Sequence, residues 1–305
     1  MTHPGATPFW EPLVQGRTYE LEYSANYLAV PRSFCPDDLA WVRGFVSGSR
    51  RSAVEAVLKR TVRFCLFKDR GYCGVGVSLP AGLICDDEEK TKDRSASREN
   101  YLFLGGVAQH NEKLFPNPPY HPGIPELGAL WRNLREVFGP LYEDFVVARY
   151  HEKPLPGRGG ELLAIRSEPR LLFPPDLPVV TSAPTTVALS RGRGEPVKIW
   201  RSASEAELWA SACLARAPVS LCLSMAKEED ARASRFDHVT IGGGQLERSL
   251  QGREAPRPPS PGPDHPSPDP GPPRSDRKLQ FRAFGRRITL TIEPVSESQQ
   301  GSMTP

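Results

Sequence analysis

Apolar positions recur with helical spacing most clearly between Leu127 and Phe145. They fall at steps of three and four, and charged residues occupy most positions between them. This spacing predicts an amphipathic helix that packs one stripe of side chains against a sheet. Because Gly139 and Pro140 interrupt the pattern, we expect a kink there or a second short helix that begins at this point.

Three other segments carry signals for a helix start. Pro36 and the two aspartates after it precede the apolar stretch LAWVRGFV, which predicts a short helix. Ser52 with Glu55, and Ser204 with Glu207, have the spacing of a capping box, in which the two residues satisfy each other's backbone N–H groups.

Alternating and β-branched residues predict strands in the rest of the chain. Residues 61–79 read as one β-hairpin with the turn KDRG. If Asp69, Arg70 and Gly71 form its loop, Cys65 lies opposite Val75. Further strands are predicted within 18–30, 100–108, 185–190, 197–200, 219–225 and 238–244, and a second hairpin after residue 278.

The distribution of proline and glycine divides the chain. The sequence holds 33 prolines and 26 glycines, an excess typical of long irregular segments. We expect an α+β protein of two small domains with mainly antiparallel sheets and a few packed helices. The expected parts are a flexible leader 1–16, a first domain 17–151 with a disordered loop 86–99, a linker 152–178, a second domain 179–293 with a proline-rich disordered insert 250–278, and a flexible tail 294–305.

The hairpin after the proline-rich insert cannot be stable alone, because an isolated two-stranded hairpin is marginal in water. We therefore expect it to return across the insert and to extend the sheet of the second domain. The insert then becomes a long surface loop with polyproline character.

Composition and charge narrow the classes of function. Hydrophobic residues make up 38% and charged residues 25% of the chain, and the net charge is +3. This charge is too small to indicate a nucleic-acid or membrane partner. No secretory signal and no apolar run long enough to span a bilayer is visible, so we expect a cytoplasmic protein with reduced cysteines.

Metal and cofactor sites are not expected. Cys65, Cys73 and Cys85 are spaced without any C-x-x-C pair, whereas tetrahedral zinc usually recruits cysteines as close pairs. The glycines at 71, 74 and 76 lie inside a hairpin, and no Walker lysine follows any glycine-rich stretch. The cysteines are interpreted as small apolar residues of buried strands.

The first hypothesis for function is a noncatalytic cytosolic adaptor or regulatory protein, which acts by binding another protein of unknown identity. Arg98, Asn100, Arg286 and Arg287 are the candidate interaction residues. This hypothesis depends on the absence of catalytic signatures and on the flexible segments that interrupt both expected domains.

Two alternatives stay open. The first is an enzyme with a cysteine–histidine centre in the first domain, for which Cys73 and His110 are the least implausible catalytic pair. The second is single-stranded nucleic-acid binding by two hairpins that carry basic and aromatic residues. Alternation is the favoured explanation of that second pattern, since aromatic residues enter the core while arginines face solvent.

Overall fold

The structure is a computed structural model that describes residues 9–18, 26–92, 98–109, 122–153, 162–183, 187–189, 195–216, 218–242, 277–283 and 286–292. The chain divides into two compact units, residues 1–255 and residues 256–305. The first unit contains a nine-stranded sheet, and the second contains a two-stranded sheet.

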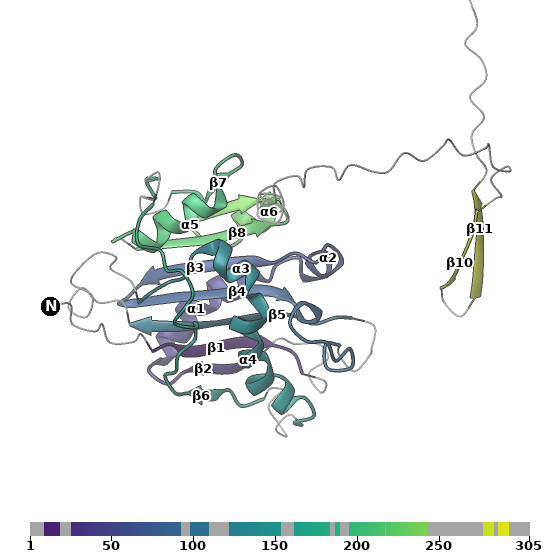
Figure 1. The fold of residues 1–305 in the computed structure, drawn as a ribbon, viewed down its shortest axis with the longest axis horizontal. Helices are drawn as coiled ribbons and strands as arrows, with labels where there is room; N and C mark the ends of the chain where they lie inside the picture. The colour runs from purple at the N-terminus through teal and green to yellow at the C-terminus, as the bar shows by residue number, and fades with distance from the viewer. Residues whose placement is uncertain are drawn as a thin grey trace, which may run out of the picture. The chain divides into compact units, whose positions relative to one another are not determined.

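A single nine-stranded sheet organises the first unit (Figure 1). The strand order is β6-β2-β1-β5-β4-β3-β8-β9-β7. Most neighbours are antiparallel, but β2–β6, β7–β9 and β8–β9 are parallel. The strands are β1 (Glu11–Gly16), β2 (Asn26–Pro31), β3 (Arg63–Asp69), β4 (Tyr72–Pro80), β5 (Tyr101–Gln109), β6 (Ile165–Ser167), β7 (Lys198–Trp200), β8 (Val219–Met225) and β9 (His238–Ile241).

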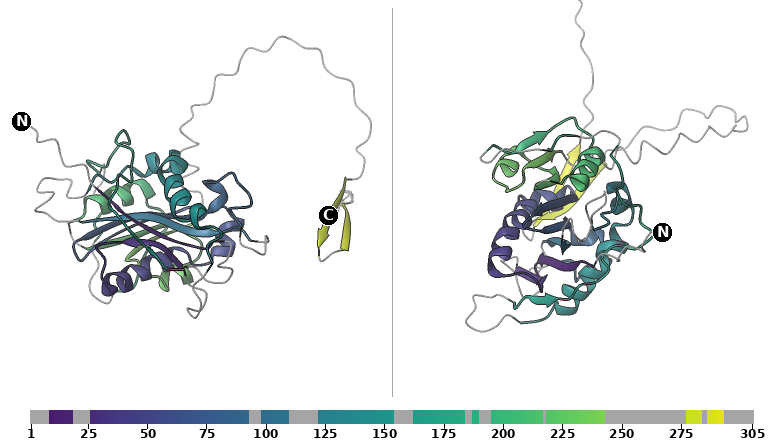
Figure 2. Two further views of the ribbon diagram at one scale, coloured as in Figure 1. Left: turned by 90° about the horizontal axis from the view of Figure 1, so that it is seen from below. Right: turned by 90° about the vertical axis from the view of Figure 1, so that its left-hand side faces the viewer.

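Helices cover both faces of this sheet (Figure 2). The described α-helices are α1 (Pro36–Ser49), α2 (Ala53–Leu58), α3 (Leu127–Arg132), α4 (Leu134–Phe145), α5 (Glu205–Leu214) and α6 (Glu228–Arg232), with 3-10 turns at Ala81–Leu83 and Val147–Arg149. Side chains of α3, α4 and α5 enter one core cluster, and those of α1 and α6 enter the other. The arrangement is therefore helix, sheet, helix.

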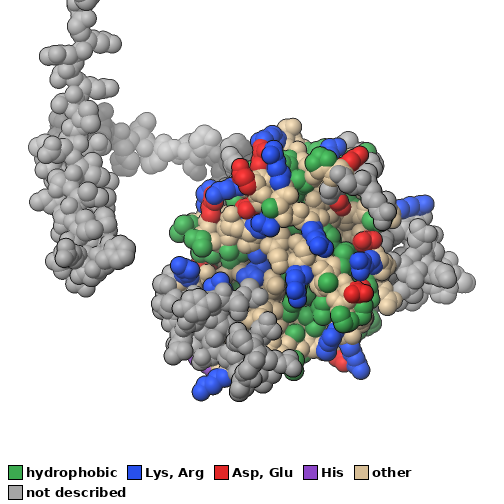
Figure 3. Space-filling view, turned by 180° about the vertical axis from the view of Figure 1, so that it is seen from behind, with side chains coloured by type: hydrophobic (Ala, Val, Ile, Leu, Met, Phe, Trp, Pro, Cys, Tyr) green, Lys and Arg blue, Asp and Glu red, His purple; other side chains and the backbone are tan. Residues whose placement is uncertain are grey.

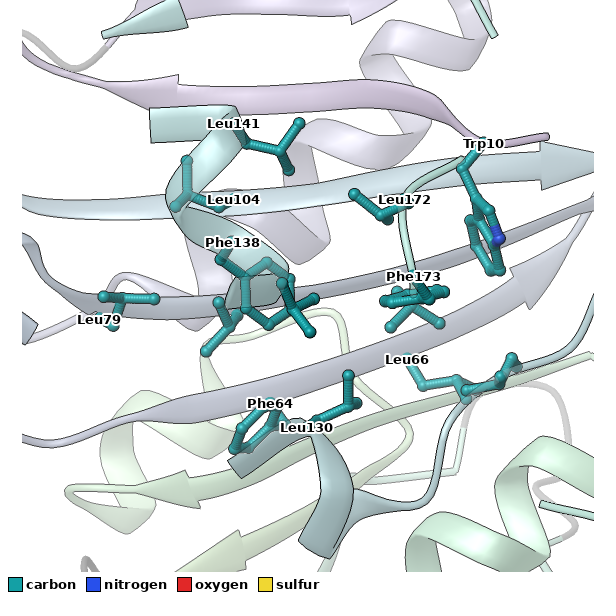
Figure 4. Close-up of a cluster of buried hydrophobic side chains, with 14 of the residues drawn as sticks. Trp10, Phe64, Leu66, Leu79, Leu104, Leu130, Phe138, Leu141, Leu172 and Phe173 are labelled. Atoms are coloured by element: carbon teal, nitrogen blue, oxygen red, sulfur yellow. The ribbon is translucent and has the colours of Figure 1, made fainter. Parts of the chain in front are cut away.

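The central strands are buried on both faces, which explains their continuous apolar character. On β3, Phe64 and Leu66 belong to the core beneath α3, α4 and α5 (Figure 4), whereas Cys65 and Phe67 belong to the core beneath α1. Phe67 and Phe45 of α1 stack with ring centroids 5.0 Å apart. Each strand of the centre thus supplies side chains to two cores.

The expected division into two domains within residues 17–293 is not seen. β3 pairs with β8 in antiparallel register, with Cys65 opposite Cys222, so segments on either side of the expected linker share one sheet. The expected linker 152–178 itself contains β6, which pairs with β2. As the prolines and glycines predicted, most of the described part of this segment has irregular backbone. However, Leu172 and Phe173 in the same segment are buried in the core.

The expected leader 1–16 also contains ordered structure. β1 begins at Glu11 and lies between β2 and β5 in the interior of the sheet. Its side chains Leu13 and Val14 are fully buried. A strand is possible here because Pro12 lies near its start, although proline cannot donate a ladder hydrogen bond.

The expected loop 86–99 lies only partly within the described residues, which omit 93–97. Its first part is held against α4 and the turn that follows it: Tyr142 Oη donates to Lys90 O at 2.7 Å, and Tyr150 Oη lies within hydrogen-bonding distance of the carbonyls of Glu89 and Lys92. Thr91 is buried. Part of this polar loop is therefore packed against the rest of the fold, although its composition predicted disorder.

The hairpin at 61–79 is confirmed, but its register differs by one position from the expected one. Asp69 pairs with Tyr72, which leaves a two-residue turn, and Cys65 lies opposite Gly76. Arg70 and Gly71 both have positive φ, 54° and 78°. This is the backbone that a two-residue hairpin turn requires, and it matches the twist of the flanking strands.

The predicted amphipathic helix exists as α3 and α4, but the break falls at Asn133 and not at Gly139. Asn133 Nδ2 donates to Ala129 O at 2.9 Å, so its side chain satisfies a carbonyl at the end of α3. Pro140 lies inside α4. The two capping boxes also differ: Ser204 accepts from Glu207 N, whereas Ser52 makes no capping hydrogen bond.

The second unit contains β10 (Arg277–Ala283) and β11 (Arg286–Ile292), which pair in antiparallel register. This confirms the predicted hairpin. It forms a two-stranded sheet of its own and does not extend the nine-stranded sheet as expected. The insert 250–278 and the tail 294–305 lie almost entirely outside the described residues.

The close approach of β4 and β5 gives a test of this fold. A Cβ added to Gly105 would lie 2.4 Å from Val75 O and 2.7 Å from Gly76 Cα. We expect Gly105→Ala to lower the free energy of unfolding by about 1–3 kcal/mol, because backbone must move. A Cβ on Gly139 of α4 meets nothing within 4 Å outside its own helix and its neighbours in the chain, so Gly139→Ala should change the free energy of unfolding by less than about 1 kcal/mol, because the gain in helix propensity is opposed by crowding against Pro140. Urea unfolding measures both, and equal effects would contradict the register.

Candidate functional site

A pocket of about 320 Å³ opens beside α2. It lies where the end of α1, the short helix α2 and the start of β5 come together. Its lining residues are Arg17, Arg50, Ala53, Val54, Val57, Leu58, Arg98, Glu99, Asn100 and Tyr101. The size is at the lower end of the range for small-ligand sites.

Backbone geometry places Arg50 in this pocket. Arg50 is the residue that ends α1, and Ser52, with φ 51°, turns the chain into α2. The Arg50 guanidinium donates to Tyr101 O from Nε at 3.1 Å and from Nη2 at 2.7 Å, and to Gln15 Oε1 from Nη1 at 2.9 Å. These neutral acceptors fix the guanidinium against the sheet.

The Arg50 guanidinium is buried close to a second arginine, Arg17. Burial, together with the nearby Arg17 charge, lowers the pKa of Arg50 to about 10. The other groups that act on Arg50 are the phenols of Tyr101 and Tyr27, and no carboxylate of the described residues is among them. A buried guanidinium is usually paired with a carboxylate, so this arrangement is unusual.

A second buried arginine lies next to Tyr101. Arg63 is fully buried and donates to Ser49 O at 2.9 Å and Arg51 O at 2.5 Å, which satisfies carbonyls at the end of α1. Its guanidinium carbon lies 5.6 Å from the centroid of the Tyr101 ring. Arg63 therefore adds to the positive potential behind the pocket wall.

Glu99 is the one acidic residue among the lining side chains, and its carboxylate is engaged elsewhere. Glu99 Oε1 accepts a hydrogen bond from Gly82 N at 2.6 Å, and Oε2 lies 3.8 Å from Arg60 Nη1. Glu99 therefore does not pair with Arg50 among the described contacts.

Asn100 adds an unused hydrogen-bond donor. Its backbone holds it in place, because Asn100 N donates to Thr91 O and Ala81 N donates to Asn100 O. The side chain is only 3% exposed, and its Nδ2 has no hydrogen-bond partner within the described ranges. A buried amide nitrogen without a partner costs about 1–3 kcal/mol, which a ligand can recover.

The lining also contains apolar residues of α2, which extend onto the surface. Val54 and Leu58 are four positions apart on α2, which places them on the same side of the helix. Val54 is 64% exposed and Leu58 is 81% exposed. The pocket therefore combines basic donors with an adjacent apolar surface.

The structure brings together two of the predicted interaction residues and leaves two apart from them. Arg98 and Asn100 both line the pocket. Arg286 and Arg287 lie on β11 in the second unit, and their side chains are outside the described part of the structure. The four residues therefore do not form one described site.

The candidate catalytic cysteine lies in an unreactive environment. Cys73 is fully buried, and burial raises the pKa of its thiol to about 11. It faces Lys68 across the hairpin, and Lys68 Nζ donates to the carbonyls of Cys213 and Ala215 at the end of α5. His110 lies outside the described residues, so the proposed pairing with Cys73 stays a prediction.

The other central thiol points to the opposite face of the sheet. Cys65 lies across from Cys222, and their Sγ atoms are 3.7 Å apart within the core beneath α1. Burial is the main cause that raises the pKa of Cys65. Cys65 and Cys73 are therefore not neighbours in space, although they are close in sequence.

Other kinds of site find little support in the described ranges. No group of three or more His, Cys, Asp or Glu side chains there could hold a metal ion. Among the same residues, no helix is both long enough and apolar enough to cross a bilayer. On the face turned away from the viewer of Figure 1, Lys and Arg side chains are dispersed among hydrophobic ones (Figure 3), not gathered in a stripe.

Comparison of the chain with protein-family models, with curated proteins and with solved structures finds no match.

Of the residues that line this candidate pocket, sequence reasoning named Arg98 and Asn100 but not Arg17, Arg50 or the apolar residues of α2. The available signal was the pair Val54 and Leu58 at helical spacing in a helix of only six residues. A helix of this length has no further turns that could cover Val54 and Leu58, so their side chains stay exposed. Arg50 gave no signal, because its role depends on where the end of α1 meets β1 and β5.

Native thiol labelling tests the assignment of the cysteines. Cys35 is exposed, whereas Cys65, Cys73, Cys213 and Cys222 are fully buried. We expect a bulky maleimide to modify Cys35 at least about a hundredfold faster than the four buried thiols at neutral pH, since a thiolate that can be reached is the reactive form. Peptide mass spectrometry after timed labelling measures each rate. Rapid modification of Cys73 would contradict its burial and would revive the cysteine–histidine hypothesis.

Proposed function

We propose that this chain is a noncatalytic adaptor or regulatory protein that binds another protein through the surface formed by α2 and the pocket beside it. The observation that carries the proposal is the juxtaposition of the buried Arg50, which no carboxylate of the described residues contacts, with the exposed side chains of Val54 and Leu58. Interfaces are rich in arginine and in apolar anchors that become buried on binding.

Electrostatics supports a partner with acidic character. Arg50 has no carboxylate partner among the described residues, and Arg98, a second lining arginine, is exposed. Complementary charge would steer an acidic segment to this surface, and the apolar contact with α2 would add affinity. A catalytic role has less support here, because the described lining residues include no thiol, imidazole or serine hydroxyl.

Substitution of the apolar pair on α2 tests the proposal. Burying a valine and a leucine contributes about 1.5–3 kcal/mol each. We therefore expect the double variant Val54→Ser, Leu58→Ser to lower the affinity for peptides selected from a random library by at least about tenfold. Isothermal titration calorimetry on the full chain measures it.

Leu163→Ser is the matched control, because Leu163 is 62% exposed and is not among the lining residues. It should bind the selected peptides like the wild type. Recovery of no peptide sequence from the library, or equal loss of affinity in both variants, would contradict binding at α2.

A further inference from the structure

We infer that the pocket beside α2 recognises the free carboxyl terminus of a partner protein whose last residue is apolar. This inference rests on the proposed function and names the chemical group that the site takes. Three features carry it: unused donors at the basic side, the lack of a counter-charge among the described residues, and the apolar wall next to both.

The donors match a carboxylate. An arginine has five N–H groups, and Arg50 uses three of them in hydrogen bonds to Gln15 and Tyr101. The remaining two, together with the partnerless Asn100 Nδ2, can serve the two oxygens of a carboxylate. Arg98 lines the same pocket and can add a donor from its exposed position.

The lack of a described counter-charge favours an anion from outside. Glu99 is directed to Gly82 N and Arg60, so it does not neutralise Arg50. Taking a guanidinium out of water is unfavourable unless it is paired. A bound carboxylate would pair with the Arg50 guanidinium in a partly enclosed place, where charge-assisted hydrogen bonds are strong.

The apolar wall selects among anions. Ala53, Val54, Val57 and Leu58 lie on the same pocket as the arginines. The carboxylate of an aspartate or glutamate brings only methylene groups and leaves this wall uncovered. At a chain terminus, the carboxylate and the last side chain stem from one Cα, so both walls can be contacted at once. A phosphate group would engage the arginines but would leave the wall unused.

Matched peptides test the inference on the full chain. The probes are N-acetylated peptides that end in leucine, prepared as the free acid and as the C-terminal amide. We expect the free acid to bind at least about tenfold more tightly, because only the acid carries the charge that strengthens the hydrogen bonds from Arg50. Methyl resonances of Val54, Val57 and Leu58 should shift on addition of the acid, which locates the binding.

Variants separate the carboxylate site from general charge. Asn100→Asp replaces the unused donor by an acidic oxygen and supplies the missing charge from within. We expect it to abolish binding of the free acid and to raise the thermal midpoint. Arg98→Ala should weaken binding about two- to fivefold, as expected for an exposed charge. Arg132→Ala, which changes an exposed arginine on α3, is the control and should bind like the wild type.

Each outcome decides a separate question. Equal affinity for acid and amide, or unchanged binding by Asn100→Asp, would overturn the carboxyl-terminus assignment and leave binding at α2 intact. Competition by inorganic phosphate as effective as that by the free acid would show a general anion site and would also overturn it. If neither peptide form shifts the methyl resonances while library peptides still bind through Val54 and Leu58, only the carboxyl-terminus assignment fails. If no peptide of any kind binds at α2, the proposed function fails with it.

Discussion

Burial of one sheet on both faces is the constraint on which the rest of this structure depends. With α3, α4 and α5 on one side and α1 and α6 on the other, the central strands have no face that can be polar without a specific partner. This burial crowds aromatic side chains against the strands, and the absence of a side chain at Gly74 and Gly76 makes room for them. A Cβ on either would meet the ring of Phe67 or Phe103 at 2.0 and 2.3 Å. The aromatic rings lie over strand backbone, and glycine makes that possible.

The same constraint explains the buried charges. Lys68 and Arg63 lie on β3 at positions that are 2% and 0% exposed. Each lies next to the end of a helix, where carbonyl groups lack partners within the helix. Lys68 donates to the carbonyls at the end of α5, and Arg63 to those at the end of α1. The cations therefore hold helix ends onto the sheet, and they occupy positions that apolar alternation alone would assign to leucine or valine.

Local patterns of the sequence predicted elements well and their assembly poorly. The hairpin at 61–79 and the helical stripe from Leu127 to Phe145 depend on neighbours in sequence, and both were confirmed. The shared sheet depends on the pairing of β3 with β8, and nothing near Cys65 in sequence indicates Cys222. Proline-rich composition between 152 and 178 suggested a linker, since composition cannot tell a buried irregular segment from an exposed one. The same holds for the candidate pocket. Arg98 and Asn100 were named from the sequence as polar residues beside a predicted strand, whereas the position of Arg50 in the pocket could be recognised only from the fold.

The order of strands in the sheet has a consequence for how the chain folds during its synthesis. β1, β5, β4 and β3 are complete once about the first third of the chain has been synthesised, yet β3 then has an open edge. That edge stays unprotected until β8 emerges, because no earlier described strand pairs with it. Long-range pairing of this kind is slow and leaves hydrogen-bonding groups available to other chains. Until β8 is available, the open edge of β3 can therefore pair with a strand of another chain.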